Sequence, residues 1–274
     1  MNDFKYVSDD YNINKTITYR LSIQLNPDGF SVLIADAHKN ILFLLHRKGE
    51  NFGDNLSEFK DNMDLYPVTN LRFARSVILV NTTEFTLVPS EYYSEDLREL
   101  YIRFSHPLMD FEQVMTNRLE NPDARLLFKL KEKHIGLIKS FHNSPAIVHS
   151  SVPYLEYIMT GYQGEDGLFI HHTGNLLSLS RTRNNQLELH NIIEAVDDND
   201  ITYHTLNTFK HLGMNRDSDK ILYSGTLNEN SEAVNILSRY IGQIVPLKNE
   251  FPFELAGDLN ENYFINLLKS TGCV

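Results

Sequence analysis

Apolar and polar residues alternate near the start of the chain. Over Lys15–Leu25 every second residue is apolar, a period of two that predicts a half-buried strand. Two further strands are predicted over Phe30–Asp36 and Ile41–His46, and short segments rich in turn-forming residues separate the three. The last of them is apolar on both faces, as expected of a strand inside a sheet. The chain is therefore predicted to open with a three-stranded antiparallel meander.

The pattern then changes to a mixture of helical spacing and short apolar runs. Asn55–Leu65 carries apolar residues at helical spacing, and Ser94 followed by acidic residues predicts a helix start. The further predicted elements are strands at Ser76–Val80, Glu84–Pro89, Phe111–Leu119, Ala124–Leu130 and Ala146–His149, and helices at Lys131–His142 and around Pro153.

A second copy of this order follows the glycine-rich stretch Gly161–Gly167. It is predicted to hold three short strands, a helix begun by Asp197–Asp200, and the strand, glycine turn and helix that contain Ser224-Gly225-Thr226. A short strand and a closing helix over Asn260–Lys269 complete it. We therefore predict two domains, residues 1–163 and 164–274, which repeat structural order without a residue-for-residue repeat.

Composition narrows the functional classes. The chain has 274 residues and a formal net charge of −11, which disfavours nucleic acid and anionic membranes as partners. The single cysteine, Cys273, allows no intrachain disulfide and no cysteine metal cluster. The N-terminus lacks the pattern of a signal peptide, and no run of about 18 apolar residues is present. We expect a cytoplasmic protein that is not inserted in a membrane.

The β-β-β-α-β-α-β order used twice resembles the actin-like ATPase superfamily, which has a duplicated ribonuclease H-like fold. The extra elements at about residues 85–130 resemble the subdomain inserted in the first lobe of the bacterial cell-division, pilus-assembly and secretion-assembly homologues. More closely, the chain is similar to an uncharacterised bacterial family of actin-like domains of unknown function. The resemblance implies an α/β fold of two actin-like lobes with mixed five-stranded sheets, flanking helices and a small α+β insertion in the first lobe.

The resemblance also implies where a nucleotide would bind. The corresponding residues are Asp28 and Gly29 in the first hairpin, Thr173 and Gly174 in the second, and Ser224 and Gly225 at the adenosine-contacting turn. The first strand and the second hairpin lack the aspartate that active members use, and a proline in the first turn removes one N–H group. The motifs are therefore degenerate, and an ordinary turn is the simpler interpretation of Asp28-Gly29.

The glycine turn Ser224-Gly225-Thr226 has two interpretations. It is compatible with a phosphate-cradling turn before a helix N-terminus. Alternatively, Asn228 or Asn230 caps that helix, its first turn is already acidic, and the glycine marks a lobe of the fold.

Four other groups of residues could suggest chemistry, but each has a simpler structural explanation. His171 and His172 lie on opposite faces of a strand, which disfavours a shared metal. The acidic run Asp197–Asp200 is explained by a helix cap, and His149-Ser150-Ser151 by a core or cap role, because no nucleophile motif surrounds it. Arg181 and Arg183 are expected on a solvated face. We predict no catalytic residue and no metal site.

Three functions remain from the sequence. The first is a non-catalytic scaffold with no cofactor, which binds a protein partner through residues 85–130. The second is a divergent ATP-binding protein or weak ATPase that uses ATP and Mg at the six residues named for the nucleotide. The third is a small-molecule kinase, for which no base or magnesium ligand can be placed.

Overall fold

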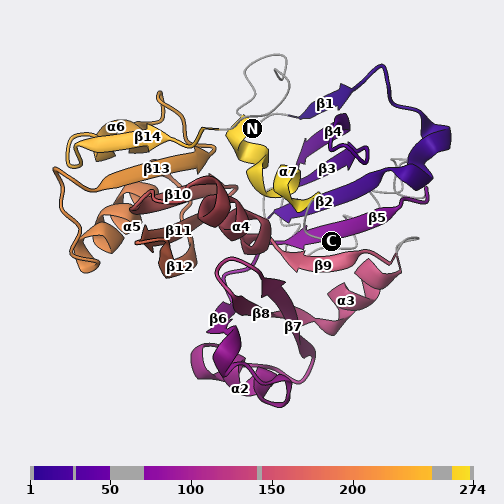
Figure 1. The fold of residues 1–274 in the computed structure, drawn as a ribbon, viewed down its shortest axis with the longest axis horizontal. Coiled ribbons are helices and arrows are strands. Elements are labelled where there is room, and N and C mark those ends of the chain that lie inside the picture. The colour runs from indigo at the N-terminus through magenta and orange to yellow at the C-terminus, as the bar shows by residue number, and fades with distance from the viewer. Residues whose placement is uncertain (1–2, 27–28, 50–70, 141–143, 249–260, 272–274) are drawn as a thin grey trace. The chain divides into compact units, whose positions relative to one another are not determined.

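The computed structural model describes residues 3–26, 29–49, 71–140, 144–248 and 261–271 (Figure 1). The chain forms two compact units, Met1–Glu156 with Asn266–Val274, and Tyr157–Ile265. The first boundary falls inside helix α4 (Ser151–Gly161), and the C-terminal segment joins the first unit, whereas the sequence prediction divided the chain after residue 163. The predicted helix at 55–65 lies outside the described residues, as does the cysteine at 273.

The first unit is built on a six-stranded mixed sheet. Strands β2, β3 and β4 form the predicted antiparallel meander, and β5 and β9 continue it in parallel beside β2. Strand β1, which the sequence pattern did not indicate, pairs with the outer edge of β4. In spatial order the strands are β1 (Phe4–Val7), β4 (Ile41–Lys48), β3 (Gly29–Ala35), β2 (Arg20–Asn26), β5 (Arg75–Val80) and β9 (Ala146–His149).

The prediction for the first strand is wrong at its beginning. Residues Ile13–Thr18 form a 3-10 helix, and the strand starts at Arg20. The Asn12 side chain accepts a hydrogen bond from the Asn14 backbone N–H, and Ile17 is exposed. An asparagine that bonds its own backbone favours a turn over a strand, and this local bond outweighs the alternating pattern.

The insertion is a small subdomain formed by residues 85–131, which we call the inserted subdomain. Helix α2 (Arg98–Ser105) packs on a three-stranded antiparallel sheet of β6 (Phe85–Pro89), β8 (Ala124–Lys131) and β7 (Glu112–Leu119). The small core between helix and sheet contains Val88, Ile102, Val114 and Leu127. Helix α3 (Glu132–Lys139) then leads back towards β9.

Two side chains join the inserted subdomain to the main sheet of the first unit. The His149 ring on β9 lies 4.9 Å from the Phe85 ring and 5.2 Å from the Phe128 ring. The Asn117 side chain on β7 donates to the Ile147 carbonyl and accepts from the His149 N–H. Asn117 thus satisfies backbone groups on the outer edge of β9, the side that does not pair with β5.

The second unit repeats the strand order of the first. The order β12-β11-β10-β13-β14 corresponds to β4-β3-β2-β5-β9, with three antiparallel strands followed by two parallel ones. This confirms the predicted duplication of structural order. The elements are β10 (Gly167–Thr173), β11 (Leu176–Arg183), β12 (Gln186–Glu194), α5 (Asp198–His211), β13 (Lys220–Gly225), α6 (Glu232–Leu237) and β14 (Gln243–Pro246); α7 (Ile265–Ser270) follows.

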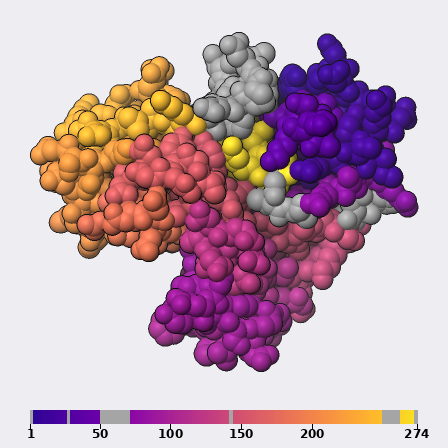
Figure 2. All heavy atoms as spheres, in the orientation of Figure 1, coloured from indigo at the N-terminus to yellow at the C-terminus, as the bar shows by residue number. Residues whose placement is uncertain are grey.

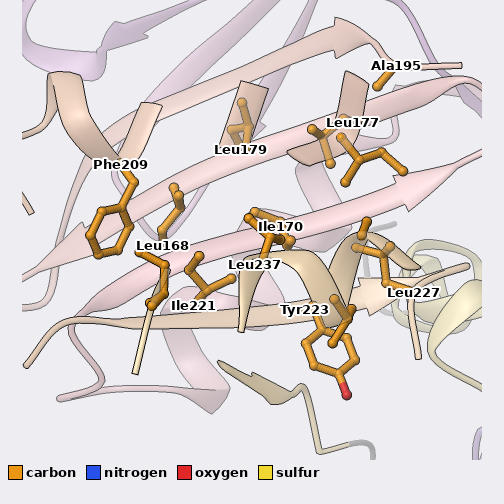
Figure 3. Packing of buried hydrophobic residues seen from close by; sticks show 14 residues of the cluster. Leu168, Ile170, Leu177, Leu179, Ala195, Phe209, Ile221, Tyr223, Leu227 and Leu237 are labelled. Carbon is orange, nitrogen blue, oxygen red and sulfur yellow. The ribbon is translucent and has the colours of Figure 1, made fainter. Parts of the chain in front are cut away.

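One apolar face of the second sheet packs against its helices (Figure 3). Leu168, Ile170 and Tyr223 on the strands contact a cluster that includes Phe209 of α5 and Leu237 of α6. These side chains alternate along β10 and β13, as a half-covered strand requires. The core therefore fixes the ends of β10 and β13, where the candidate site residues lie.

Candidate functional site

The structure brings four of the six predicted nucleotide residues together. Strands β10 and β13 are parallel neighbours in which His172 pairs with Gly225. Thr173 and Gly174 therefore lie beside Ser224 and Gly225, at the carboxyl ends of the two strands. Gly29 begins β3 in the first unit. Asp28 lies outside the described residues.

The turn Ser224–Thr226, which we call the glycine turn, requires glycine for a structural reason. Gly225 has φ +83°, and a Cβ atom there would lie 2.0 Å from the His172 carbonyl oxygen. The next residue, Thr226, donates its N–H to the same oxygen at 2.8 Å. Gly29 is similar, because its Cβ would lie 2.1 Å from the Arg47 carbonyl oxygen. Close approach of backbones therefore explains both glycines without a ligand.

The side chains of the glycine turn bond to histidines of β10. His172 Nε2 lies 3.0 Å from the Ala195 carbonyl oxygen, so this nitrogen donates and Nδ1 accepts from the Thr226 hydroxyl. His171 Nδ1 lies 2.8 Å from Ser224 Oγ. The two histidines thus engage separate partners, in agreement with their predicted positions on opposite faces of the strand.

Burial keeps His171, which bonds to the glycine turn, uncharged. His171 and Ser224 are almost completely buried, and Thr173 is 1% exposed. Burial, together with a smaller effect of the neighbouring His172, lowers the pKa of His171 to about 3. The imidazole of His171 is therefore neutral near pH 7 and supplies no positive charge to an anion.

The N-terminus of helix α6 already holds a carboxylate. Asp198 Oδ1, at the start of α5, accepts a hydrogen bond of 2.9 Å from the Ala233 N–H. The prediction that Asn228 or Asn230 caps α6 is wrong: Ser231 precedes the helix, and the Asn228 side chain accepts from the Asn230 N–H instead. A negative side chain near the first turn occupies the place where a phosphate would gain most from free N–H groups.

Two other predicted groups have structural roles. Asp197 caps α5 by accepting from the Asp200 N–H, so the helix-cap interpretation is confirmed. His149 is buried, accepts from the Ser151 N–H and donates to the Thr82 carbonyl. Within the described ranges, no three His, Cys, Asp or Glu side chains lie close enough together to hold a metal ion.

The prediction that Arg181 lies on a solvated face is wrong. Arg181 is 5% exposed rather than solvated, whereas Arg183 is exposed as expected. Both guanidinium groups lie within 4 Å of the Glu188 carboxylate, at 3.8 and 3.9 Å respectively. Arg181 lies at a β-bulge in the pairing of β11 with β12, an irregularity that a sequence pattern does not show.

The inserted subdomain, the region from which the sequence analysis expects partner binding, exposes a group of apolar side chains that the sequence did not identify individually (purple in Figure 2). Six of the thirteen large apolar side chains left exposed in the described part of the chain fall between residues 92 and 111. They are Tyr92, Leu97, Leu100, Phe104, Met109 and Phe111, and Phe104 is 94% exposed. Helical spacing alone could have identified part of this set, but it could not tell which side of the helix faces the core.

A pocket of about 480 Å³ lies in the same subdomain, between the start of α2 and the strands β7 and β8. We call it the arginine pocket, because three arginines line it. Its lining residues are Glu95, Arg98, Gln113, Val114, Met115, Thr116, Arg118 and Arg125.

Comparison with known proteins gives a family and a fold. The chain matches the family model "Protein of unknown function (DUF3822)" over residues 8–244. A Bacteroides thetaiotaomicron protein with actin-like ATPase fold and unknown function is similar with a TM-score of 0.79 and 22% identity, over 86% of this chain and 93% of that chain. A search of curated proteins gives no match.

Two more distant solved structures share the fold. A chain of the PilM–PilN type IV pilus biogenesis complex has a TM-score of 0.62 and 11% identity, over 93% of this chain and 98% of its own. The ethanolamine utilization protein EutJ from Carboxydothermus hydrogenoformans has a TM-score of 0.50 and 8% identity, over 92% of this chain and 88% of its own. No helix in the described part of the chain has the length and apolar character needed to cross a membrane.

These similarities agree with the strand order found in both units and confirm the predicted actin-like, two-lobe α/β fold. The first sheet departs from the expectation only by its additional edge strand. With 237 consecutive residues matched by the family model, the chain belongs to the DUF3822 family of proteins of unknown function.

Proposed function

We propose that this protein is a non-catalytic, cytoplasmic interaction protein that uses the actin-like fold as a scaffold and binds a protein partner through its inserted subdomain. The observation that carries the proposal is the state of the glycine turn. Its hydroxyl groups bond to buried histidines, and the N-terminus of the helix after it already contacts the Asp198 carboxylate. These two hydroxyl groups and the Ala233 N–H are therefore already hydrogen-bonded within the protein, and the proposal includes no cofactor.

The distribution of exposed groups supports the other half of the proposal. The inserted subdomain concentrates exposed apolar side chains, and such concentrations in soluble proteins mark interaction sites. A chain of the same fold occurs in the PilM–PilN type IV pilus biogenesis complex, so the fold is compatible with binding another protein. Fold similarity does not fix function, so the residues of the surface carry the argument.

Thermal unfolding with ATP and Mg²⁺ tests the proposal against the alternative of a divergent ATP-binding protein. A ligand at 100 times its dissociation constant adds about 2.7 kcal/mol of stability, which corresponds to a rise of roughly 5–10 °C for a chain of this size. We expect no rise at millimolar ATP·Mg. A rise of that size, together with ATP hydrolysis by the purified protein, would show that the glycine turn serves a nucleotide.

A further inference from the structure

We propose that the inserted subdomain is a docking site for one kind of partner, a protein segment that places an acidic side chain next to apolar ones. Its apolar side chains pack on an apolar stripe formed by Leu97, Leu100 and Phe104, and its carboxylate enters the arginine pocket. The inference rests on the proposed function and adds the chemistry of the partner.

The apolar stripe lies on the outer side of helix α2. Leu100 and Phe104 are spaced i, i+4 and so share one side of the helix, and Leu97 directly precedes its first residue. The opposite side packs on the sheet through Ile102, which is completely buried. Helix α2 therefore has two apolar sides, of which only one is covered by the described residues.

The helix that carries the stripe is anchored to the rest of the subdomain. Ile102 fixes the helix against β6, β7 and β8, and the Tyr101 hydroxyl donates to the Tyr92 carbonyl at 2.6 Å. A partner that covers apolar side chains on an anchored helix gains burial energy without ordering the helix backbone first. Such preorganisation is what a docking surface requires.

Arg125 gives the arginine pocket its charge. Its guanidinium lies over the Tyr93 ring at 5.7 Å and donates to Ser90 Oγ at 3.3 Å. No carboxylate lies within 4 Å of it among the described residues. Ser90 Oγ in turn donates to Asp123 Oδ1 at 2.6 Å, so this carboxylate reaches Arg125 only through a hydroxyl. The guanidinium is thus held in position without a direct ion pair, and a bidentate carboxylate is its best ligand.

The other two arginines of the pocket form exposed ion pairs that an incoming carboxylate can replace. Arg98 pairs with Glu95 at 3.0 Å and Arg118 with Glu120 at 3.2 Å, and all four side chains are about half exposed or more. Exposed pairs of this kind contribute little stability, so an incoming carboxylate competes with them at low cost. The pocket is also large enough for a side chain, since small-ligand sites begin at roughly 300 Å³.

Charge complementarity favours an acidic segment at the arginine pocket, but only one with few acidic side chains. The chain carries a net charge of −11, so most of its surface repels anions. A local group of arginines beside an apolar stripe favours one or two acidic side chains among apolar residues. A polyanion would meet repulsion beyond the pocket. Leu97 of the stripe directly precedes Arg98, which lines the pocket, so the two features are adjacent along the chain.

Selection of displayed random dodecapeptides on the full-length protein tests this inference. We expect the selected peptides to be enriched in Asp or Glu next to aromatic or aliphatic residues. A synthetic peptide from that set should bind at least about tenfold more weakly to Arg125→Gln and to Phe104→Ser, because such anchors carry much of an interface's energy. Raising the salt concentration should weaken binding to the wild type more than to Arg125→Gln.

Matched controls are available in the second unit. Arg183→Gln removes an exposed arginine, and Tyr203→Ser removes an exposed aromatic residue that is 64% exposed; neither should change binding. Selected peptides without acidic enrichment, no selected peptide, or equal binding by Arg125→Gln and Arg183→Gln would each overturn the inference. Binding of ATP·Mg would contradict the proposed function. It would not change the peptide outcomes, which test the docking site separately.

Discussion

The glycine turn of the second unit and the surface of the inserted subdomain differ in whether their side chains are bonded within the protein or exposed. At the glycine turn, Ser224 and Thr226 are bonded to His171 and His172, and the backbone leaves no room for a Cβ at Gly225. In the inserted subdomain, apolar side chains are exposed, and the half-buried Arg125 makes no direct ion pair among the described residues. Under the proposed function, the glycine at the motif position serves packing, whereas the inserted subdomain provides the binding surface.

The largest expected effect tests the packing role of the glycine turn. Gly225→Ala should lower the free energy of unfolding by more than about 3 kcal/mol, since the new Cβ would meet the His172 carbonyl at a strained φ. Gly164→Ala is the control, because Gly164 has φ +81° but nothing within 4 Å of a Cβ, and it should cost only about 1–2 kcal/mol. Denaturant unfolding measures both, and equal losses would contradict the packing explanation.

The second effect concerns the base of the inserted subdomain. Lys129 is buried, and its Nζ lies 2.9 Å from Glu84, 3.2 Å from Glu112 and 2.7 Å from the Pro107 carbonyl oxygen. Lys129→Met should cost about 3 kcal/mol, because the largely buried Glu112 carboxylate would lose its partner.

Lys133→Met, at an exposed position of α3, is the control for Lys129→Met and should change stability by less than about 0.5 kcal/mol. Denaturant unfolding of both variants makes the comparison. If Lys129→Met were as stable as the wild type, the ion pairs would not support the loop that carries Met109 and Phe111.

The third effect is a loss of folding stability at low pH, caused by protonation of His149. Burial lowers the pKa of His149 to about 4 in the folded protein, whereas the ordinary value is about 6.5. The unfolded chain therefore takes up a proton first, and stability that is present above pH 6.5 is lost as the pH falls towards 4. This group alone should account for about 2 kcal/mol between pH 7 and pH 5.

The variant His149→Gln isolates that contribution, since glutamine does not titrate and can still donate to Thr82 and accept from Ser151. Urea unfolding at pH 7 and pH 5 should show a smaller loss for the variant than for the wild type. The same loss in both proteins would mean that other groups, such as His171 with its pKa near 3, cause the acid sensitivity.

The smallest expected effect is on the outer side of α2. Phe104→Ser should change the free energy of unfolding by less than about 0.5 kcal/mol, because Phe104 is almost fully exposed. Ile102→Ala on the same helix should cost about 2–4 kcal/mol, because Ile102 is fully buried. Thermal or denaturant unfolding compares them, and a large cost for Phe104→Ser would show that the stripe is part of the fold rather than a free surface.

Most of the fold could be predicted from the sequence, because strands such as β3, β4, β7 and β8 follow the apolar pattern and are bounded by turn residues. The beginning of the first strand could not, because the bond from Asn14 to the Asn12 side chain favours a 3-10 turn. Strand β1 has only four residues and too short a pattern to be recognised.

The candidate site was harder to predict because its residues depend on contacts between elements distant in sequence. Asp198 reaches the start of α6 from another helix, and Arg181 is buried at a bulge. The exposed side of α2 follows helical spacing as well as the buried side does, and only the packing of Ile102 distinguishes them.

Amide hydrogen exchange of the full-length protein tests the central claim most directly, because it reports where a ligand acts along the chain. With a selected acidic and apolar peptide, we predict slower exchange over residues 92–118, and with millimolar ATP·Mg no change at residues 172–174 or 224–226. Protection of those two segments by ATP·Mg, with none over 92–118 in the presence of the peptide, would contradict the account.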